Sequence, residues 1–305
     1  MGVRYFIEPK LDKPDLIASW PGICNIGLVA TDMLRVQIGA EPLAEIEPWD
    51  FFYPKKVVIQ GGVLRSLDFP GSTFYYARLK TKDVIVFVGE EQPADGARLY
   101  AEGRKAYQIA NLVLDVAERF GCRRVYASGA AVALSHHTLP PRVRVAAGSE
   151  ALNREIRTTY ANTLLMSERR GRGDTGSITG LNGLLLGMAK KRGLEAVCLM
   201  GEIPDYLSTV PLPYPRASRS VLDVLARILG ITVDFGPLEA MAAQVDEIIT
   251  GIYDKLPPEI RERVDQRKAA LQPAAEAITE EDEKWISEHI DELFKKGGGR
   301  NERPT

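Results

Sequence analysis

Short runs of consecutive apolar residues alternate along the chain with longer segments whose apolar residues recur every three or four positions. The short runs are typical of strands covered on both faces, and the longer segments are typical of amphipathic helices. The alternation predicts repeated strand–helix units of a parallel α/β sheet. Strands are expected at 16–20, 44–46, 83–89, 122–128, 143–147 and 196–200, and helices at 28–38, 97–120, 150–160, 181–192, 217–229 and 238–253.

A glycine-rich turn, a helix and a short strand follow one another in the second half of the chain. Gly171, Gly173 and Gly176 can adopt backbone angles closed to other residues, which permits a tight turn. The helix after them ends in three basic residues and then Gly193, a common way for a helix to stop. The apolar run at 196–200 predicts a buried strand, and open α/β sheets place ligand sites in the loops beyond such strand ends.

The three glycines also have the spacing of a dinucleotide-binding fingerprint, with Glu202 near the position of a ribose-binding acid. The residues before them, MSERR at 166–170, are not the buried strand that this motif requires. A phosphate-binding P-loop is excluded, because Ser177 and Ile178 stand where Lys and Ser or Thr are needed.

Two further strands, at 57–60 and 73–79, flank a segment that contains Gly61-Gly62 and Pro70-Gly71. Turn residues between two such strands predict that they pair as an antiparallel hairpin.

Four aromatic residues lie between two prolines in the segment PWDFFYP. Such a cluster is most often a core or a subunit contact, because aromatic side chains dominate burial in both. A ligand platform is the alternative. The candidate interface residues are Trp49, Phe51, Phe52 and Tyr53.

The three cysteines are widely spaced and lie in apolar stretches, so Cys24, Cys122 and Cys198 are expected to be free thiols in a core. The adjacent His136 and His137 lack acidic or cysteine partners at metal-ligand spacing. No Gly-x-Ser-x-Gly nucleophile elbow is found. We therefore expect no metal, no cofactor and no complete catalytic constellation.

Composition and charge narrow the class further. The chain has 305 residues, 45% hydrophobic and 26% charged, as in ordinary globular proteins. A net charge of −2 gives no reason to expect nucleic acid or an anionic membrane as partner. Without a signal peptide or an apolar run near the ~20 residues of a membrane helix, we expect a cytoplasmic protein with no membrane span.

The composition changes toward charged residues of helical spacing after Pro257. This change predicts an α/β domain at 1–255, a helical extension at 256–296 that docks on the body or a neighbouring subunit, and a disordered polar tail at 297–305.

Polar residues at the predicted strand ends and helix starts form a candidate cleft. Glu90 and Glu91 could perform acid–base chemistry or hold a cation, but a solvated loop or a helix cap is the alternative. Backbone N–H groups after Gly27 and Gly176 suit an anion, whereas Thr179 and Asn182 could instead satisfy local backbone. The candidate ligand-binding residues are Asn25, Gly27, Glu90, Gly176, Thr179, Asn182, Glu202 and Tyr206.

Several of these segments carry a family resemblance. The run SITGLNGLLLGMAKKRGLEAVCLMGEIPDY resembles the hallmark segment of the proteasome assembly chaperone 2 family, once catalogued as a domain of unknown function. LIASWPGICNIGLVATDML and IGAEPLAEIEPWDFF resemble its first strand, turn and helix, and VFVGEEQP and VYASGA its next strand ends. The resemblance covers about residues 16–253. Older catalogues linked the family to ATP-dependent ligases of the ATP-grasp kind, but no Lys-bearing phosphate loop or metal-binding acidic pair is present here.

The resemblance implies a three-layer α/β/α sandwich similar to nucleoside-phosphorylase and peptidyl-hydrolase folds. It also implies a homo-oligomer, with a trimer as one arrangement, that binds proteasome α-subunits during assembly. Members that act on proteasomes typically end in a hydrophobic-Tyr-x tail, whereas this sequence ends in NERPT. Two functions follow as hypotheses: a non-enzymatic assembly chaperone or scaffold, and a protein or enzyme that binds a small anion or nucleotide in the strand-end cleft.

Overall fold

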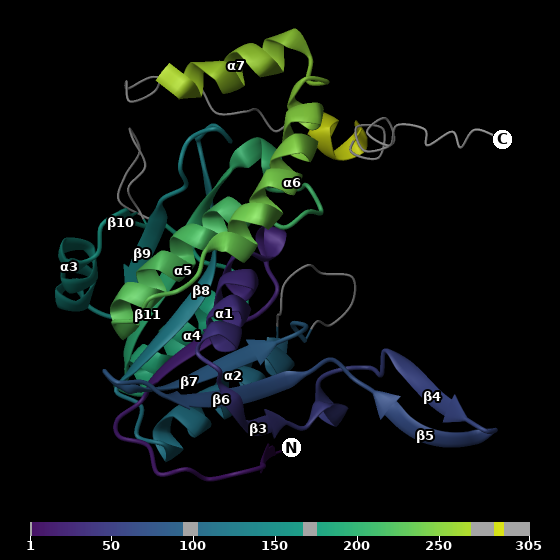
Figure 1. Cartoon of the computed structure of the whole chain (residues 1–305), viewed down its shortest axis with the longest axis vertical. Coiled ribbons are helices and arrows are strands. Elements are labelled where there is room, and N and C mark those ends of the chain that lie inside the picture. The colour runs from purple at the N-terminus through teal and green to yellow at the C-terminus, as the bar shows by residue number, and fades with distance from the viewer. Residues whose placement is uncertain (1, 94–102, 167–175, 270–283, 290–305) are drawn as a thin grey trace.

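A nine-stranded mixed sheet forms the centre of the protein (Figure 1). The computed structural model describes residues 2–93, 103–166, 176–269 and 284–289. The strand order is β1-β3-β6-β7-β2-β8-β11-β9-β10, and β7, β2, β8 and β11 run parallel to one another in the middle. The strands are β1 (Val3–Tyr5), β2 (Asp15–Ser19), β3 (Glu41–Ile46), β6 (Ser72–Arg78), β7 (Asp83–Gly89), β8 (Arg124–Ala133), β9 (Val143–Ala147), β10 (Thr163–Leu165) and β11 (Glu195–Pro204).

Helices cover both faces of this sheet, which confirms the predicted three-layer α/β/α sandwich. Figure 1 views the sheet from the side of α1, α5 and α6, with α2 and α4 behind it. The helices are α1 (Ile26–Gln37), α2 (Gly103–Arg119), α3 (Glu150–Thr159), α4 (Gly180–Lys191), α5 (Pro215–Leu229), α6 (Gly236–Tyr253) and α7 (Pro258–Ala269), with short 3₁₀ turns at Ile23–Asn25, Pro48–Asp50 and Asp205–Leu207.

The central strands are buried on both faces, as their unbroken apolar runs predict. In β2, Leu16 and Ala18 face α2 and α4, whereas Ile17 faces α1 and α5. All five β2 residues are buried. Because successive side chains of a strand point to opposite faces, one short run supplies both cores.

Helix α1 approaches the sheet unusually closely at Gly27. A Cβ built on Gly27 would lie 2.3 Å from the carbonyl carbon of Ser128 in β8, so no larger residue fits there. The Ser128 hydroxyl donates to the Gly27 carbonyl at 3.1 Å and lies 2.8 Å from the Thr31 hydroxyl. The glycine after the first strand therefore has a packing role in joining α1 to β8.

One predicted pairing is wrong. Strand β4 (Lys56–Gln60) pairs with β5 (Val63–Asp68), not with the strand at 73–79, which is β6 and pairs with β3 and β7. Gly61 and Gly62 both have positive φ and close the β4–β5 hairpin with a two-residue turn. β5 reads VLRSLD, which is neither a continuous apolar run nor a strict alternation, so its strand signal is weak.

Some predicted features lie outside the described residues. They are the helix start at 97–102, Gly171 and Gly173 of the glycine-rich turn, residues 270–283 and 290–296 of the helical extension, and the tail at 297–305. Gly193 has φ +76 just after α4, as predicted for a helix stop. Within the described residues, no helix combines the length and apolar character needed to cross a membrane.

Candidate functional site

The parallel strands β2, β7, β8 and β11 end at one edge of the sheet, where the sequence places its candidate cleft. The Gln92 side chain lies across this edge. Its Nε2 donates to the Pro21 carbonyl, and its Oε1 accepts from the Leu181 N–H at 3.3 Å. The loop after β7 therefore fastens the loop after β2 to the start of α4.

Asn182 and Glu202 lie on the α2/α4 face of the sheet. Asn182 is buried against β8, so close that a Cβ on Gly129 would come 2.9 Å from its Nδ2. Its Oδ1 has no hydrogen-bond partner among the described residues. Asn182 therefore does not cap its helix through Oδ1.

Glu202 is almost fully buried near the end of β11. Its Oε1 lies 2.8 Å from Nη2 of Arg144, and its Oε2 lies 3.3 Å from both the backbone nitrogen and Nε of Arg142. The Glu202 carboxylate thus ties β11 to the segment that leads into β9.

Tyr206 and Gly27 lie on the opposite, α1/α5 face. The Tyr206 hydroxyl accepts from the His137 backbone N–H at 2.9 Å and lies 2.7 Å from Nδ1 of the same histidine. Burial raises the pKa of Tyr206 far above its ordinary value, which keeps the phenol neutral. Asn25 is exposed at the start of α1, with φ +50. The sheet therefore separates two groups of candidate residues that the sequence treats as one cleft.

The Glu90 carboxylate joins separate segments of the chain. Its Oε2 lies 2.8 Å from Nζ of Lys55 and accepts from the Gly71 N–H at 3.0 Å. The hydrogen bond from Lys55, followed by that from Gly71, lowers the pKa of Glu90. Since Lys55 precedes β4 and Gly71 precedes β6, the carboxylate holds the two ends of the β4–β5 hairpin to the end of β7.

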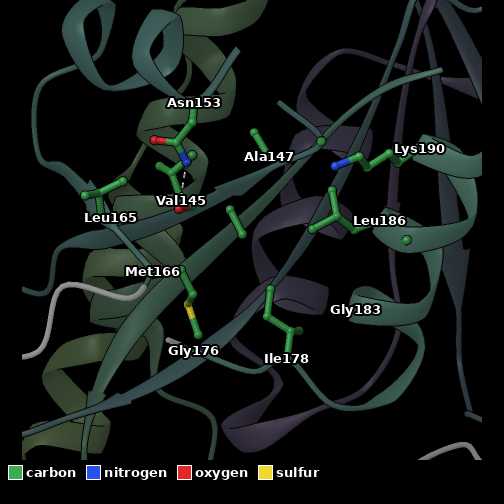
Figure 2. A pocket seen from close by; sticks show the side chains of 13 residues that line it. Val145, Ala147, Asn153, Leu165, Met166, Gly176, Ile178, Gly183, Leu186 and Lys190 are labelled. Atoms are coloured by element: carbon green, nitrogen blue, oxygen red, sulfur yellow. Dashed lines mark hydrogen bonds between the residues drawn. The ribbon is translucent and has the colours of Figure 1, made fainter. Parts of the chain in front are cut away.

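Gly176 lies at a cavity of about 480 Å³ between α3, α4, β9 and β10 (Figure 2). Figure 2 shows Leu186 and Lys190 of α4 on one side and Asn153 of α3 on the other, with the Asn153 amide 3.2 Å from the Val145 carbonyl. Thr179 is exposed at the N-cap of α4 and makes no side-chain capping bond.

The aromatic cluster is divided between the core and the surface. Phe51 is buried in the protein's own core, and Phe52 is half-buried against it. Trp49 and Tyr53 are 67% and 91% exposed. Trp49 and Tyr53 thus remain candidates for a contact with another molecule, whereas Phe51 serves the fold.

A cluster that the sequence did not predict joins the histidine loop to the C-terminal helices. The buried His136 ring lies 4.2 Å from the His137 ring and edge-on to Tyr253 at the end of α6. Burial lowers the pKa of His136 to about 4, so its ring is neutral at physiological pH. Arg267 of α7 forms a buried ion pair with Asp205, just after β11. Partners 62 residues apart leave no local pattern by which a sequence could reveal them.

The cysteines are free, as predicted; Cys122 and Cys198 are buried in the core, whereas Cys24 is half-buried. Burial raises the pKa of Cys122 and Cys198 to about 12, which leaves both as unreactive thiols. Among the described residues, no group of three or more His, Cys, Asp or Glu side chains is arranged to hold a metal ion.

A mixed sheet with parallel strands at its centre and helices on both faces defines a three-layer α/β/α protein. The PAC2 family model matches residues 16–252, and the chain belongs to the PAC2 family. This confirms the resemblance found in the sequence. An uncharacterised protein of Methanocaldococcus jannaschii, MJ1210, is 28% identical over 248 residues, which cover 81% of this chain and 85% of that protein.

Solved structures have the same fold. PbaB of Pyrococcus furiosus, described as an archaeal proteasome activator, aligns with a TM-score of 0.67 at 25% identity and covers 82% of this chain and 97% of its own. Rv2125 of Mycobacterium tuberculosis, a proteasome-assembly chaperone homologue, aligns with a TM-score of 0.62 at 22% identity over 83% of this chain and 99% of its own.

Proposed function

We propose that this protein is a non-enzymatic, chaperone-like assembly factor that acts as a homo-oligomer and binds subunits of proteasome type. The observation that carries the proposal is the similarity to PbaB, which extends over 97% of that proteasome activator at 25% identity. Sequence similarity along nearly a whole chain favours a shared mode of action more than similarity of fold alone would.

The strand-end edge supports a binding role. Gln92, Glu202 and Tyr206 direct their polar groups into bonds that join loops, strands and helices of the protein itself. These bonds tie the described parts of the edge to one another. An edge held by its own bonds suits a protein that presents a fixed surface to a partner, because less ordering cost remains to be met on binding.

The test is native mass spectrometry of the full-length protein after co-expression with archaeal proteasome α-subunits. The proposal predicts a complex that contains both chains, and faster formation of α-rings than in the same expression without this protein. Recovery of this protein alone, with unchanged α-ring formation, would contradict it.

A second candidate function is the binding of a small anion or nucleotide, which the cavity beside Gly176 favours. Among the described residues that line this cavity, Lys190 is the charged one. A rise in melting temperature with inorganic phosphate or a nucleotide, lost in Lys190→Ala and kept in Lys191→Ala, would support this function. No rise with any of these ligands would count against it.

A further inference from the structure

The β4–β5 hairpin, residues 56–68 and here called the arm, extends away from the nine-stranded sheet as a separate two-stranded sheet (Figure 1). Its register sorts its side chains, because cross-strand partners share a face and successive residues alternate. Val57 pairs with Leu67 and Ile59 with Leu64; the register shifts between Val58 and Ile59 and skips Arg65, so these cross-strand pairs place four apolar side chains on one face. We call this the apolar face of the arm; its residues are Val57, Ile59, Leu64 and Leu67.

The opposite face of the arm is mixed. There, Val58 pairs with Ser66 and Gln60 with Val63. The two faces therefore differ in chemistry, which is the pattern of a sheet that covers its apolar side against another layer.

Most of the apolar face is uncovered in the described part of the chain. Val57, Ile59 and Leu64 are each at least 54% exposed, and Leu67 at the base is half-buried. Six of the fourteen exposed large hydrophobic residues of the described chain fall within 49–64, whereas the next largest group, within 132–139, has three. Single exposed apolar residues are ordinary, but a cluster of them marks an interaction surface.

The arm is held in position at its base. Besides the Glu90 contacts with Lys55 and Gly71, the Lys55 N–H donates to the Asp68 carbonyl at 2.6 Å. An isolated two-stranded hairpin is only marginally stable in water. A second layer on the apolar face would therefore stabilise the arm as well as bind a partner.

The charges of the arm favour a second copy of this chain as that partner. The four residues of the apolar face are uncharged, and at the base Lys56 lies 3.4 Å from Asp68, which balances both charges. The remaining charged residue of the arm, Arg65, is exposed at the register shift and is not one of these four. Two identical arms can thus meet through these four residues without placing like charges opposite each other. No other stretch of similar length in the described chain has as many exposed large hydrophobic residues, so the matching surface on a second copy is its own arm.

The exposed area is adequate for such a contact. Trp49, Tyr53 and the exposed residues of the apolar face (Val57, Ile59 and Leu64) each leave on the order of 100–200 Å² of surface exposed. One copy therefore offers roughly 700 Å², near the ~800 Å² that each partner contributes to a stable interface.

We propose that the arms of neighbouring copies pack on one another through their apolar faces. This inference rests on the homo-oligomer in the proposed function and names the surface that forms it.

Sedimentation velocity of the full-length protein tests the contact. The wild type is expected to associate, and the double variant Ile59→Asp/Leu64→Asp is expected to lose at least tenfold in association constant. The matched control, Gln60→Asp/Ser66→Asp, places the same two charges on the mixed face and should associate like the wild type. Equal association of both variants, or a monomeric wild type, would overturn the proposal.

Cross-linking separates arm-on-arm contact from arm-on-body contact. Under mild oxidation, Ile59→Cys should give a disulfide-linked dimer. Val36→Cys, on the exposed side of α1, should give no more cross-linked dimer than the wild type, which retains its own three cysteines. An oligomer in which Ile59→Cys forms no cross-link would contradict arm-on-arm packing. Thermal unfolding of every variant verifies that the body is folded.

The same variants distinguish this inference from the proposed function. If the wild type captures no α-subunits but Ile59→Asp/Leu64→Asp no longer self-associates, the assembly role fails and the arm contact stands. If the wild type captures α-subunits and this double variant still self-associates, the arm contact fails and the assembly role stands.

Discussion

The Cα of Gly27 lies against the Ser128 peptide so closely that a methyl group on Gly27 would come 2.3 Å from the Ser128 carbonyl carbon. The three atoms that this methyl group would meet, the Ser128 carbonyl carbon and oxygen and the Gly129 nitrogen, are backbone atoms of a buried central strand, which cannot turn aside as a side chain can. Helix α1 and strand β8 are therefore fitted to each other at this point.

Gly27→Ala should push α1 away from β8 and lower the free energy of unfolding by about 1–3 kcal/mol. Urea denaturation measures the effect. The matched control is Gly187→Ala in α4, where a Cβ meets nothing within 4 Å. Because alanine favours helix over glycine by ~0.5–1 kcal/mol, this control should be neutral or stabilising. Equal behaviour of the two variants would refute the packing role of Gly27.

Arg267→Met should leave the Asp205 carboxylate buried beside α7 without its cation. Removal of one partner of a buried ion pair costs about 3–5 kcal/mol. Here detachment of α7 limits the loss, because Asp205 then becomes hydrated. We expect faster hydrogen exchange and proteolysis in α7, with the central sheet unchanged.

Lys268→Met is the control for that variant, since the Lys268 pair with Asp265 is half-exposed. Exposed pairs contribute ~0–1 kcal/mol, so its α7 should remain protected. If Arg267→Met left the protection of α7 unchanged, the buried pair would not be what holds this helix.

Acid should destabilise the protein through His136. Its folded-state pKa of about 4 lies below the ordinary value of 6.5, so the unfolded chain binds the proton more readily. Stability is fully present above pH 6.5 and falls as the pH drops toward 4, by roughly 2 kcal/mol between pH 6.5 and 5. His136→Gln should flatten that part of the curve. A variant with the same slope as the wild type would show that His136 is not the titrating group.

Glu90→Gln should loosen the base of the arm without unfolding the body. The Glu90–Lys55 pair is about half-exposed, so the global cost should be below about 1 kcal/mol. Hydrogen exchange should rise in residues 55–71 and stay constant in β2 and β8. Glu91→Gln, at the neighbouring position, is the control, and equal exchange in both variants would argue against the role of Glu90.

The strands that the sequence predicts best are those buried on both faces. The runs at 83–89 and 143–147 have the bounds of β7 and β9. The predicted pairing of the strand at 57–60 with the strand at 73–79 is wrong because β5 has a weak strand signal. Both faces of the arm are largely exposed, so β5 mixes charged with apolar residues. The Gly61-Gly62 turn was the stronger signal, since a two-residue turn closes a hairpin on the residues next to it.

The candidate cleft could be predicted only in part. The rule that parallel strands end at one edge placed Glu202 and Tyr206 at that edge. It did not reveal that the two lie on opposite faces, because a uniformly apolar strand does not show which way each side chain points. The partner of Tyr206 is His137, 69 residues away, and only the folded chain brings them together.

The Arg267–Asp205 pair also bears on where the folded domain ends. The family match ends at residue 252, yet Ile260 and Val264 of α7 are buried in the same core as α5 and α6. A fragment cut at the family boundary would open an apolar surface and strip a buried carboxylate of its counter-ion. Helix α7 is thus an integral part of this protein, and a boundary drawn from family likeness alone is a poor place to divide it.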